Sequence, residues 1–450
     1  MTSRIELVIF CRYEIYIVDS FISYAWGCVK IDTIMQAVDY MENNQPEKAL
    51  MLLKKYLPTA DDDKRFTIAE FYFQWGFFQE SSQILGDLIQ RYPDENELKI
   101  LQANILIELE EDSEAIQLLN EIEKNDPVYE QSLLLLADLY QVQGLFEVSE
   151  AKLLEAKQLN PNESIIDFAL AELYFSIGDH KRAIIYYEKV LSETIEIGEI
   201  SIHERLAECY ASTGEYELAL KYFQKNESDH PDDLFKFGLT AYYADRKDIA
   251  INVWKKVIEL DEHYHSVYSE LAKAYYEEEL LQEAFEIAEK GLTLDEYNKE
   301  LYYFAGKLAY QLDKVTLSEK YVRQAIVLDA DYKEAILFLI HIFKQADDQH
   351  KIVELINDIN ELGAIDPLYD LELARAYQEL ETYDKAARFY QEAFHQLKDD
   401  SLFLKEYGYF LVEDGQFDKA IEILETYLQF EPSDVETLEQ VDRLKQSREN

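Results

Sequence analysis

The sequence is poor in glycine and proline, the two residues that most often interrupt helices. Its 450 residues include 13 Gly and 8 Pro, too few to punctuate several separate globular domains. A chain of this length exceeds the size at which a single hydrophobic core usually keeps growing. It must therefore form either several domains or an array of repeats. Because no Gly-, Ser- or Pro-rich linker divides it, the composition favours the array.

Positive charge is also scarce. Lys and Arg number 43 against 91 Asp and Glu, which gives a net charge of −48. Phosphate binding needs clustered cations, so the balance argues against nucleic acid as a direct partner, and anionic membrane surfaces are disfavoured for the same reason. Two interpretations of the acidic surface stay open. It either keeps a long apolar-cored chain in solution by self-repulsion or attracts a basic partner.

Cysteines and long apolar runs are few or missing. Cys11, Cys28 and Cys209 share no metal-ligand spacing and make no disulfide framework, so we expect a reducing, cytoplasmic location. No apolar run reaches the roughly 18 residues that a membrane-spanning helix needs. We therefore expect no direct insertion into a membrane.

Motifs of catalysis and metal binding are missing as well. No phosphate-binding loop of the Gly-x-x-x-x-Gly-Lys-Ser/Thr type occurs. His263 and His265 have no third metal ligand nearby, and His203 with Glu204 lacks the second His of a zinc-protease pattern. Cys209 lies beside a small residue of its helix and is interpreted as a packing residue. We expect no enzyme activity, no metal and no cofactor.

What the sequence does contain is an internal repeat. Residues 133–162 and 204–233 share a Leu-Ala-x-x-Tyr cluster, a Gly four residues after the Tyr, further small and large apolar positions, and a Pro. The same template places repeats at 30, 62, 96, 130, 164, 200, 231, 265, 299, 333, 367 and 401, and eight of these eleven spacings are 34 residues. A fixed period of this length is typical of solenoids. We predict an all-α solenoid of about twelve helix hairpins over residues 30–434, capped by a polar helix over 435–450.

Small residues recur where the two helices of each hairpin must cross closely. In the first helices these are Ala37, Ala69, Ala103, Ala137, Ala171, Ala207, Gly238, Ala272, Gly306, Ala374 and Gly408. In the second helices they are Ala49, Ser81, Ala115, Ser149, Ala183, Ala219, Ala250, Ala284, Ser318, Ala386 and Ala420. Glycines are predicted to end five of the first helices in a left-handed conformation; these are Gly76, Gly144, Gly178, Gly214 and Gly415.

Two stretches break the pattern. In the repeat at 333–366 both small positions hold isoleucine, Ile340 and Ile352, which predicts either a wider, compensated hairpin or a hinge. The uneven spacings around residues 191–231, including the segment 192–200, suggest a second local perturbation.

The N-terminal segment 1–29 lies outside the repeats, and its β-branched and aromatic residues favour strand over helix. It is interpreted as a capping or anchoring strand, or as a stretch upstream of a natural start at Met35.

These features resemble the tetratricopeptide repeat family, and the run as a whole resembles its YpiA-type members in low-GC Gram-positive bacteria. The resemblance covers residues 30–434 and implies a right-handed superhelix. It departs from the family pattern where a Trp often begins the first helix, a position held here by residues such as Thr33, Lys99 and Leu133. The Lys/Asn clamp that some members use for chaperone tails is not reproduced, so chaperone binding is not implied.

The resemblance also implies that the first helices line a concave groove where partners bind. The positions that follow the small residues, with aromatic neighbours on the same face, then form two zones. The candidate residues of the first zone, 62–211, are Phe66, Glu70, Phe73, Asp138, Phe168, Glu172, Phe175 and Glu208. Those of the second zone, 265–412, are Lys273, Tyr276, Tyr303, Lys307, Tyr310, His341, Arg375 and Tyr409.

The change of sign between the zones leads to a functional hypothesis. The first zone would accept basic or apolar segments and the second an acidic stretch or a C-terminal carboxylate. The alternative is that these charges only pair between adjacent helices. We predict a monomeric, non-enzymatic scaffold that binds other proteins or peptide segments, and the second interpretation is a receptor for a short signalling peptide.

Overall fold

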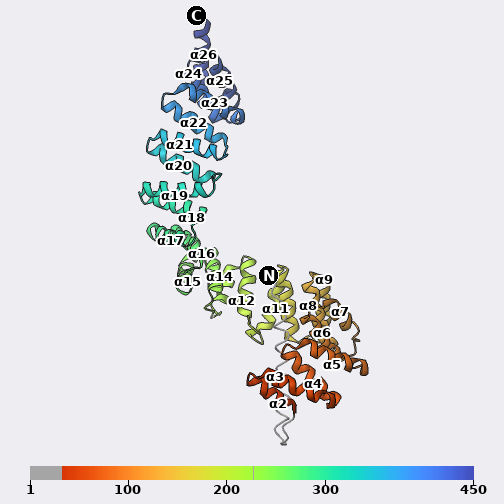
Figure 1. The fold of residues 1–450 in the computed structure, drawn as a ribbon. Helices are drawn as coiled ribbons and strands as arrows, with labels where there is room; N and C mark the ends of the chain where they lie inside the picture. The colour runs from red at the N-terminus through yellow and green to blue at the C-terminus, as the bar shows by residue number, and fades with distance from the viewer. Residues whose placement is uncertain (1–32, 227, 450) are drawn as a thin grey trace. The chain divides into compact units, whose positions relative to one another are not determined.

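The computed structural model describes residues 33–226 and 228–449, and within them the chain is almost wholly helical (Figure 1). The all-α solenoid class is confirmed, because 25 α-helices follow one another along these residues. The strand expected within residues 1–29 lies outside the described part. The chain divides into two compact units, one ending at Asp245 and the other beginning at Arg246.

The N-terminal unit contains thirteen helices in the described residues, together with one 3-10 turn and a two-stranded ribbon. They are α2 (Thr33–Glu42), α3 (Pro46–Tyr56), η1 (Leu57–Thr59), α4 (Asp62–Gln74), α5 (Phe78–Arg91), α6 (Asn96–Glu108), α7 (Asp112–Leu119), α8 (Tyr129–Val142), α9 (Phe146–Leu159), α10 (Ser164–Ser176), α11 (His180–Leu191), β1 (Glu196–Ile197), β2 (Ile200–Ser201), α12 (Ile202–Ser212), α13 (Tyr216–Phe223) and α14 (Pro231–Tyr243). Helices α2 to α13 pair in order as hairpins.

The C-terminal unit continues the same alternation. Its helices are α15 (Lys247–Leu260), α16 (His265–Glu277), α17 (Leu281–Leu294), α18 (Lys299–Gln311), α19 (Val315–Leu328), α20 (Lys333–Gln345), α21 (Gln349–Glu361), α22 (Pro367–Glu379), α23 (Tyr383–Leu397), α24 (Ser401–Glu413), α25 (Phe417–Phe430) and α26 (Val435–Glu449). Helices α16 to α25 pair as hairpins, and α26 packs on α25. Most first helices begin within two residues of the repeat starts that the sequence predicts.

The small positions lie at the helix crossings, as predicted. Every one of them is buried. A methyl group added at Gly408 would stand 2.3 Å from Leu424 Cδ2, and one added at Gly306 would stand 2.5 Å from Val322 Cγ2. The hydroxyl of Ser318 donates to the Gly306 carbonyl oxygen at 2.7 Å. Close approach of the two backbones is therefore built into the residue sizes.

A left-handed residue ends the first helix of each repeat. The predicted glycines all have positive φ, between 73° and 81°. In the other repeats the same conformation is held by residues with side chains, namely Asn44, Glu110, Asp245, Glu279, Asp313, Asp347 and Glu381. The turn geometry is therefore common to the repeats, while the residue that adopts it varies.

Both irregular stretches have a visible cause. The segment 192–200 contains the antiparallel ribbon of β1 and β2, in which Ile197 pairs with Ile200, and this ribbon lengthens the connection before α12. Ile340 and Ile352 are both buried, and α20 approaches α21 less closely than the helices of the neighbouring hairpins approach each other. The wider hairpin is therefore observed, and the hinge stays a prediction.

Candidate partner-binding groove

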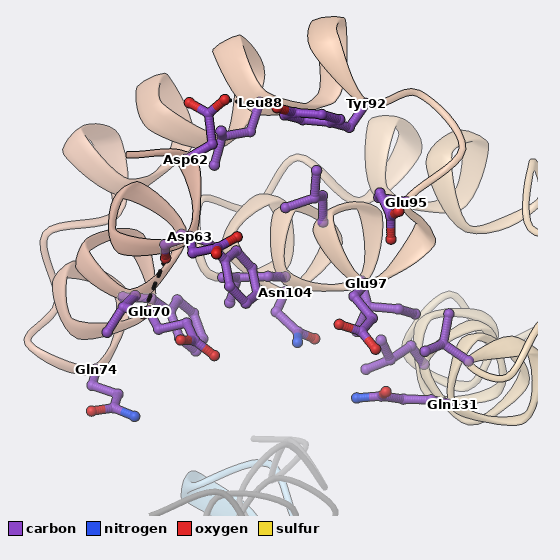
Figure 2. A pocket seen from close by; sticks show the side chains of 18 of the residues that line it. Asp62, Asp63, Glu70, Gln74, Leu88, Tyr92, Glu95, Glu97, Asn104 and Gln131 are labelled. Atoms are coloured by element: carbon purple, nitrogen blue, oxygen red, sulfur yellow. Dashed lines mark hydrogen bonds between the residues drawn. The ribbon is translucent and has the colours of Figure 1, made fainter. Parts of the chain in front are cut away.

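A hollow of about 1040 Å³ lies on the N-terminal unit, mainly along the first helices α4, α6 and α8 (Figure 2). We call it the acidic groove. Its lining residues are Asp62, Asp63, Phe66, Thr67, Glu70, Phe73, Gln74, Leu88, Tyr92, Glu95, Glu97, Leu98, Ile100, Leu101, Asn104, Val128, Gln131, Leu134 and Leu135. Three consecutive repeats therefore contribute to one surface.

Helical spacing explains how the groove is built. Phe66, Glu70 and Phe73 are four and three residues apart on α4 and so lie on one face of that helix. Leu101 and Asn104 follow the same spacing on α6, and α8 adds Gln131, Leu134 and Leu135. The packing of first helix beside first helix places these three faces side by side.

The groove is apolar along its walls and negative in charge. Five of its lining residues carry a carboxylate, and the lining contains no Lys, Arg or His. One carboxylate is already engaged, because Asp62 accepts hydrogen bonds from Arg91 Nη1 at 2.6 Å and from the Tyr92 hydroxyl at 2.8 Å. The remaining carboxylates leave the groove negative.

Two polar groups in the groove are held in unfavourable surroundings. Burial, aided by the negative charge of Glu97, raises the pKa of Glu70 to about 7. Asn104 is 7% exposed, and its Oδ1 has no hydrogen-bond partner. Figure 2 shows the Asn104 side chain between those of Glu70 and Glu97. Buried polar groups normally have hydrogen-bond partners. The Asn104 amide oxygen therefore lacks a hydrogen bond that it could accept.

The structure brings together some of the residues predicted for the first zone and separates others. Phe66, Glu70 and Phe73 all line the acidic groove. Asp138 is half-buried on α8 and lies outside the lining. Phe168 was predicted to face a partner, which is wrong, because it is fully buried in the core between α10 and α11. It is a packing residue.

Glu172 and Glu208 are held by neighbouring helices. Glu172 is 4% exposed. Its carboxylate accepts hydrogen bonds from Nε and Nη2 of Arg205, at 2.9 and 3.3 Å, and from the Tyr187 hydroxyl. Glu208 pairs with Arg205 and with Lys236. The prediction of Glu172 as an accessible partner contact is therefore wrong. At these positions the alternative, pairing between adjacent helices, is what the structure contains.

Phe175 is half-buried against the same core. The guanidinium of Arg205 lies 4.5 Å from the centroid of its ring. This contact covers one face of the ring and ties Phe175 to the ion-pair network.

Four predicted residues of the second zone do lie together on α18 and α20. Lys307 Nζ is 5.6 Å from the centroid of the Tyr303 ring, and Tyr310 makes an edge contact with His341 at 6.1 Å. Both tyrosines also pack edge-on against Phe338. Cation–ring attraction within the chain thus occupies the lysine that was expected to attract an acidic partner.

The other predicted cations are also engaged within the chain. Lys273 is exposed and lies 2.8 Å from Glu270. Arg375 donates to both carboxylate oxygens of Glu406, at 2.6 and 2.5 Å, and to Glu372 at 2.7 Å. A hollow of about 590 Å³ adjoins Arg375, but its lining also holds four acidic residues, Asp347, Glu379, Glu406 and Glu413.

Two aromatic residues of the second zone contact other parts of the chain. Tyr276 packs edge-on against Phe304, with ring centroids 5.6 Å apart. The Tyr409 hydroxyl lies 3.2 Å from Thr437 Oγ1 of α26. The second zone is therefore a set of short-range pairs along successive helices and not a continuous basic surface.

The groove also contains residues that sequence reasoning did not select. Glu97, Leu101 and Gln131 line it. The sequence prediction covered only the position after each small residue and the aromatic residues near it. Residues three and seven positions before Asn104 share its helix face. Extending the helical spacing backwards on α6 would have identified Leu101 and Glu97.

In the part of the chain that the structure describes, no three His, Cys, Asp or Glu side chains gather as a metal site requires. Within the same residues, no helix combines the length and apolar character that a bilayer crossing demands.

Cys209 is fully buried, as its packing interpretation predicts, and burial raises the pKa of its thiol to about 12.

Comparison with known proteins agrees with this architecture. Residues 367–434 match the family described as YpiA-like, C-terminal tetratricopeptide repeats. Residues 141–195 match the family described as YpiA-like, tetratricopeptide repeats, and residues 202–234 match a general tetratricopeptide repeat. The TPR repeat-containing protein YpiA of Bacillus subtilis (strain 168) is 37% identical over 414 residues, which is 92% of this chain and 98% of that protein. The chain belongs to the YpiA-type tetratricopeptide repeat family.

Two solved structures match different shares of the chain at low overall similarity. YrrB, described as a TPR protein with an unusual peptide-binding site, is 18% identical and covers 41% of this chain and 95% of its own, with a TM-score of 0.36. The Cut9–Hcn1 structure of the APC/C is 14% identical and covers 95% of this chain and 98% of its own, with a TM-score of 0.31. Tetratricopeptide repeat proteins generally mediate protein–protein interactions.

Proposed function

We propose that this YpiA-type protein is a non-enzymatic scaffold, a cytoplasmic monomer, that binds segments of partner proteins and uses the acidic groove as a binding surface. The observation that supports this most is the groove itself, in which three successive first helices combine apolar walls with carboxylates and the unpartnered Asn104 amide oxygen. Pockets that bind ligands commonly pair apolar walls with a few polar groups of this kind.

Site-specific photocrosslinking in living cells tests the proposal. A photoreactive amino acid replaces Gln74, an exposed lining residue of α4, or, as a control, the exposed Glu114 of α7 outside the groove. We expect a discrete protein partner to crosslink at position 74 and not at position 114. Mass spectrometry of the crosslinked species identifies the partner and the segment that touches the groove.

A second variant separates specific binding from chance proximity. Leu101→Asn makes the apolar wall of the groove polar without changing its charge and should abolish the crosslink at position 74. Partners captured only at position 114, or a position-74 crosslink that survives Leu101→Asn, would show that the groove is not the binding surface. A short free peptide captured in place of a protein segment would favour the receptor for a signalling peptide.

A further inference from the structure

We infer that the occupant of the acidic groove is a basic, amphipathic segment of a partner protein, with one Lys or Arg seated between Glu70 and Glu97 beside Asn104. The apolar residues of that segment would lie on the walls formed by Phe66, Phe73 and their neighbours. This inference rests on the proposed function and adds the chemistry of the partner to it.

The charge of the groove selects this partner. Glu70 and Glu97 come from adjacent first helices, and each is negative when ionised, so bringing both into a covered groove is unfavourable without a cation between them. Elsewhere in the chain the equivalent carboxylate is already satisfied, since Glu172 holds Arg205 of the next first helix. At Glu70 the corresponding position of the next first helix holds Leu101 and not an arginine, and the same helix adds the negative Glu97. A cation from a partner would fill the role that Arg205 fills beside Glu172, three repeats further along the chain.

The unpartnered amide is a second, independent observation. Asn104 Oδ1 can accept one or two hydrogen bonds and has none. The figure places the amide between the two glutamates (Figure 2). An ammonium, a guanidinium or a backbone N–H of a bound segment is the kind of group that an amide oxygen and two carboxylates accept together.

Other classes of segment fit less well. A wholly apolar segment would cover Glu70 and Glu97 without compensating them, which costs free energy. An acidic segment would be repelled by four carboxylates that no lining cation offsets. A segment with alternating apolar and basic residues meets both the walls and the charges.

Binding of a cation at Glu70 should release a proton near neutral pH. In the free protein the pKa of Glu70 is raised to about 7, and a bound cation favours its ionised form. The charged residues that line the groove with it are Asp62 and Asp63 on α4 and Glu95 and Glu97 at the start of α6, all acidic, and the charge of Glu97 adds to the rise of the Glu70 pKa. Helix α8 lines the groove with uncharged residues only. The cations of neighbouring helices are paired within the chain: Arg91 with the lining residue Asp62, and Lys99 with Glu121 outside the groove.

The experiment is a selection followed by calorimetry. A display library of random 12-residue peptides is selected against the full-length purified protein at pH 7.5. Enriched peptides are then synthesised and titrated into the parent protein, Glu70→Gln, Glu97→Gln and the control Glu114→Gln, which removes an exposed carboxylate outside the groove. Leu101→Asn, which alters the apolar wall and not the charge, reports whether a peptide occupies the groove at all.

We expect enrichment of peptides with Lys or Arg next to aromatic or aliphatic residues. Glu70→Gln and Glu97→Gln should each weaken their binding by about tenfold or more, while Glu114→Gln changes it less than twofold. Affinity of the parent protein should fall about tenfold between pH 8 and pH 6, as expected for protonation of a group with a pKa near 7. Glu70→Gln should remove most of that fall.

Failure would take two distinguishable forms. Peptides that need Leu101 but are acidic or uncharged, or that bind Glu70→Gln and Glu97→Gln as well as the parent, would overturn the basic segment and leave the groove as a binding surface. Peptides that are insensitive to Leu101→Asn, or no enrichment at all, would count against the groove itself and with it the proposed function.

Discussion

Residues that end the first helices show how much of the fold is decided at single positions. Glu110 adopts a left-handed conformation at φ 62°, which costs a residue with a side chain about 1–2 kcal/mol relative to its preferred regions. Glycine adopts this conformation without that cost but is more flexible in the unfolded chain. The same turn therefore has a different conformational free-energy cost in the repeats with glycine than in those with glutamate.

Replacing Glu110 with glycine should stabilise the protein. We expect the free energy of unfolding of Glu110→Gly to rise by about 0.5–1 kcal/mol, the net of relieved strain and added flexibility of the unfolded chain. Chemical denaturation followed by circular dichroism measures it. Glu114→Gly makes the same chemical change four residues on, inside helix α7, and should lower stability by about 0.5–1 kcal/mol. Destabilisation by both variants would contradict the argument.

Glu70 predicts a pH-dependent stability. Its pKa is raised in the folded state to about 7, so the folded protein binds this proton more tightly than the unfolded chain does. The ionised side chain therefore opposes folding above pH 7, and the effect disappears below about pH 4.5, the ordinary value for a glutamate. Glu70→Gln should be more stable than the parent by ~2–3 kcal/mol at pH 8.5, with the difference shrinking steadily as the pH falls to 5.

Urea denaturation at several pH values checks this expectation. Glu114→Gln, which removes an exposed carboxylate of the same unit, is the matched control and should show a small difference at all pH values. A difference for Glu70→Gln that is constant with pH, or that grows towards acid, would show that the buried carboxylate is not the cause.

At the scale of the helix hairpin, the size of one residue sets how closely two helices approach. Gly408 of α24 leaves no room for a methyl group, because Leu424 Cδ2 and Cγ would lie 2.3 and 2.6 Å away. Gly86 of α5 is also helical but has nothing within 4 Å of an added methyl group. The two glycines differ only in what faces them.

Gly408→Ala and Gly86→Ala should therefore have opposite effects. We expect Gly408→Ala to lower the free energy of unfolding by about 1–3 kcal/mol through overpacking, and Gly86→Ala to raise it by about 0.5–1 kcal/mol through better helix propensity. Thermal and chemical denaturation of the two variants measure both. Stabilisation by Gly408→Ala would mean that α24 and α25 separate without cost.

The hairpins were predictable from sequence because their requirements are local. A small residue at each crossing and a residue able to turn after the first helix recur at a fixed distance, and these were enough to place the repeats. Ile340 and Ile352 were correctly identified as exceptions, since two large side chains cannot occupy a close crossing. The ribbon at β1 and β2 was signalled only by an irregular spacing, because two-residue strands carry too few residues for a pattern.

The binding surface was less predictable, because it depends on pairs of residues that lie one repeat apart. Glu70 and Glu172 occupy the same position of their repeats, yet Glu172 is neutralised by Arg205 and Glu70 faces Glu97. A position-by-position interpretation cannot separate them. Comparing each charged position with the corresponding helix of the next repeat would have distinguished the satisfied carboxylate from the unsatisfied one.

At the scale of the whole molecule, the net charge of −48 predicts a dependence of stability on salt. Like charges repel across the surface of a compact state, and dissolved ions screen that repulsion over about 10 Å at 0.1 M. We expect the midpoint of thermal unfolding to rise by about 5 °C as NaCl increases from ~20 mM to ~0.5 M. Glycine betaine at equal osmolality carries no net charge and is the control for effects unrelated to screening. A midpoint that falls with salt would show that the ion pairs outweigh the repulsion.

The construction of the acidic groove from three successive hairpins has a consequence for the lifetime of the protein. Hairpins in such an array contact only their neighbours, so the hairpins near one end can open while the rest stay folded. A segment bound across α4, α6 and α8 would contact all three at once and would have to leave before any of them could open. Occupancy of the groove would then determine how quickly a protease degrades the chain from this end, and the abundance of the scaffold would follow that of its partner.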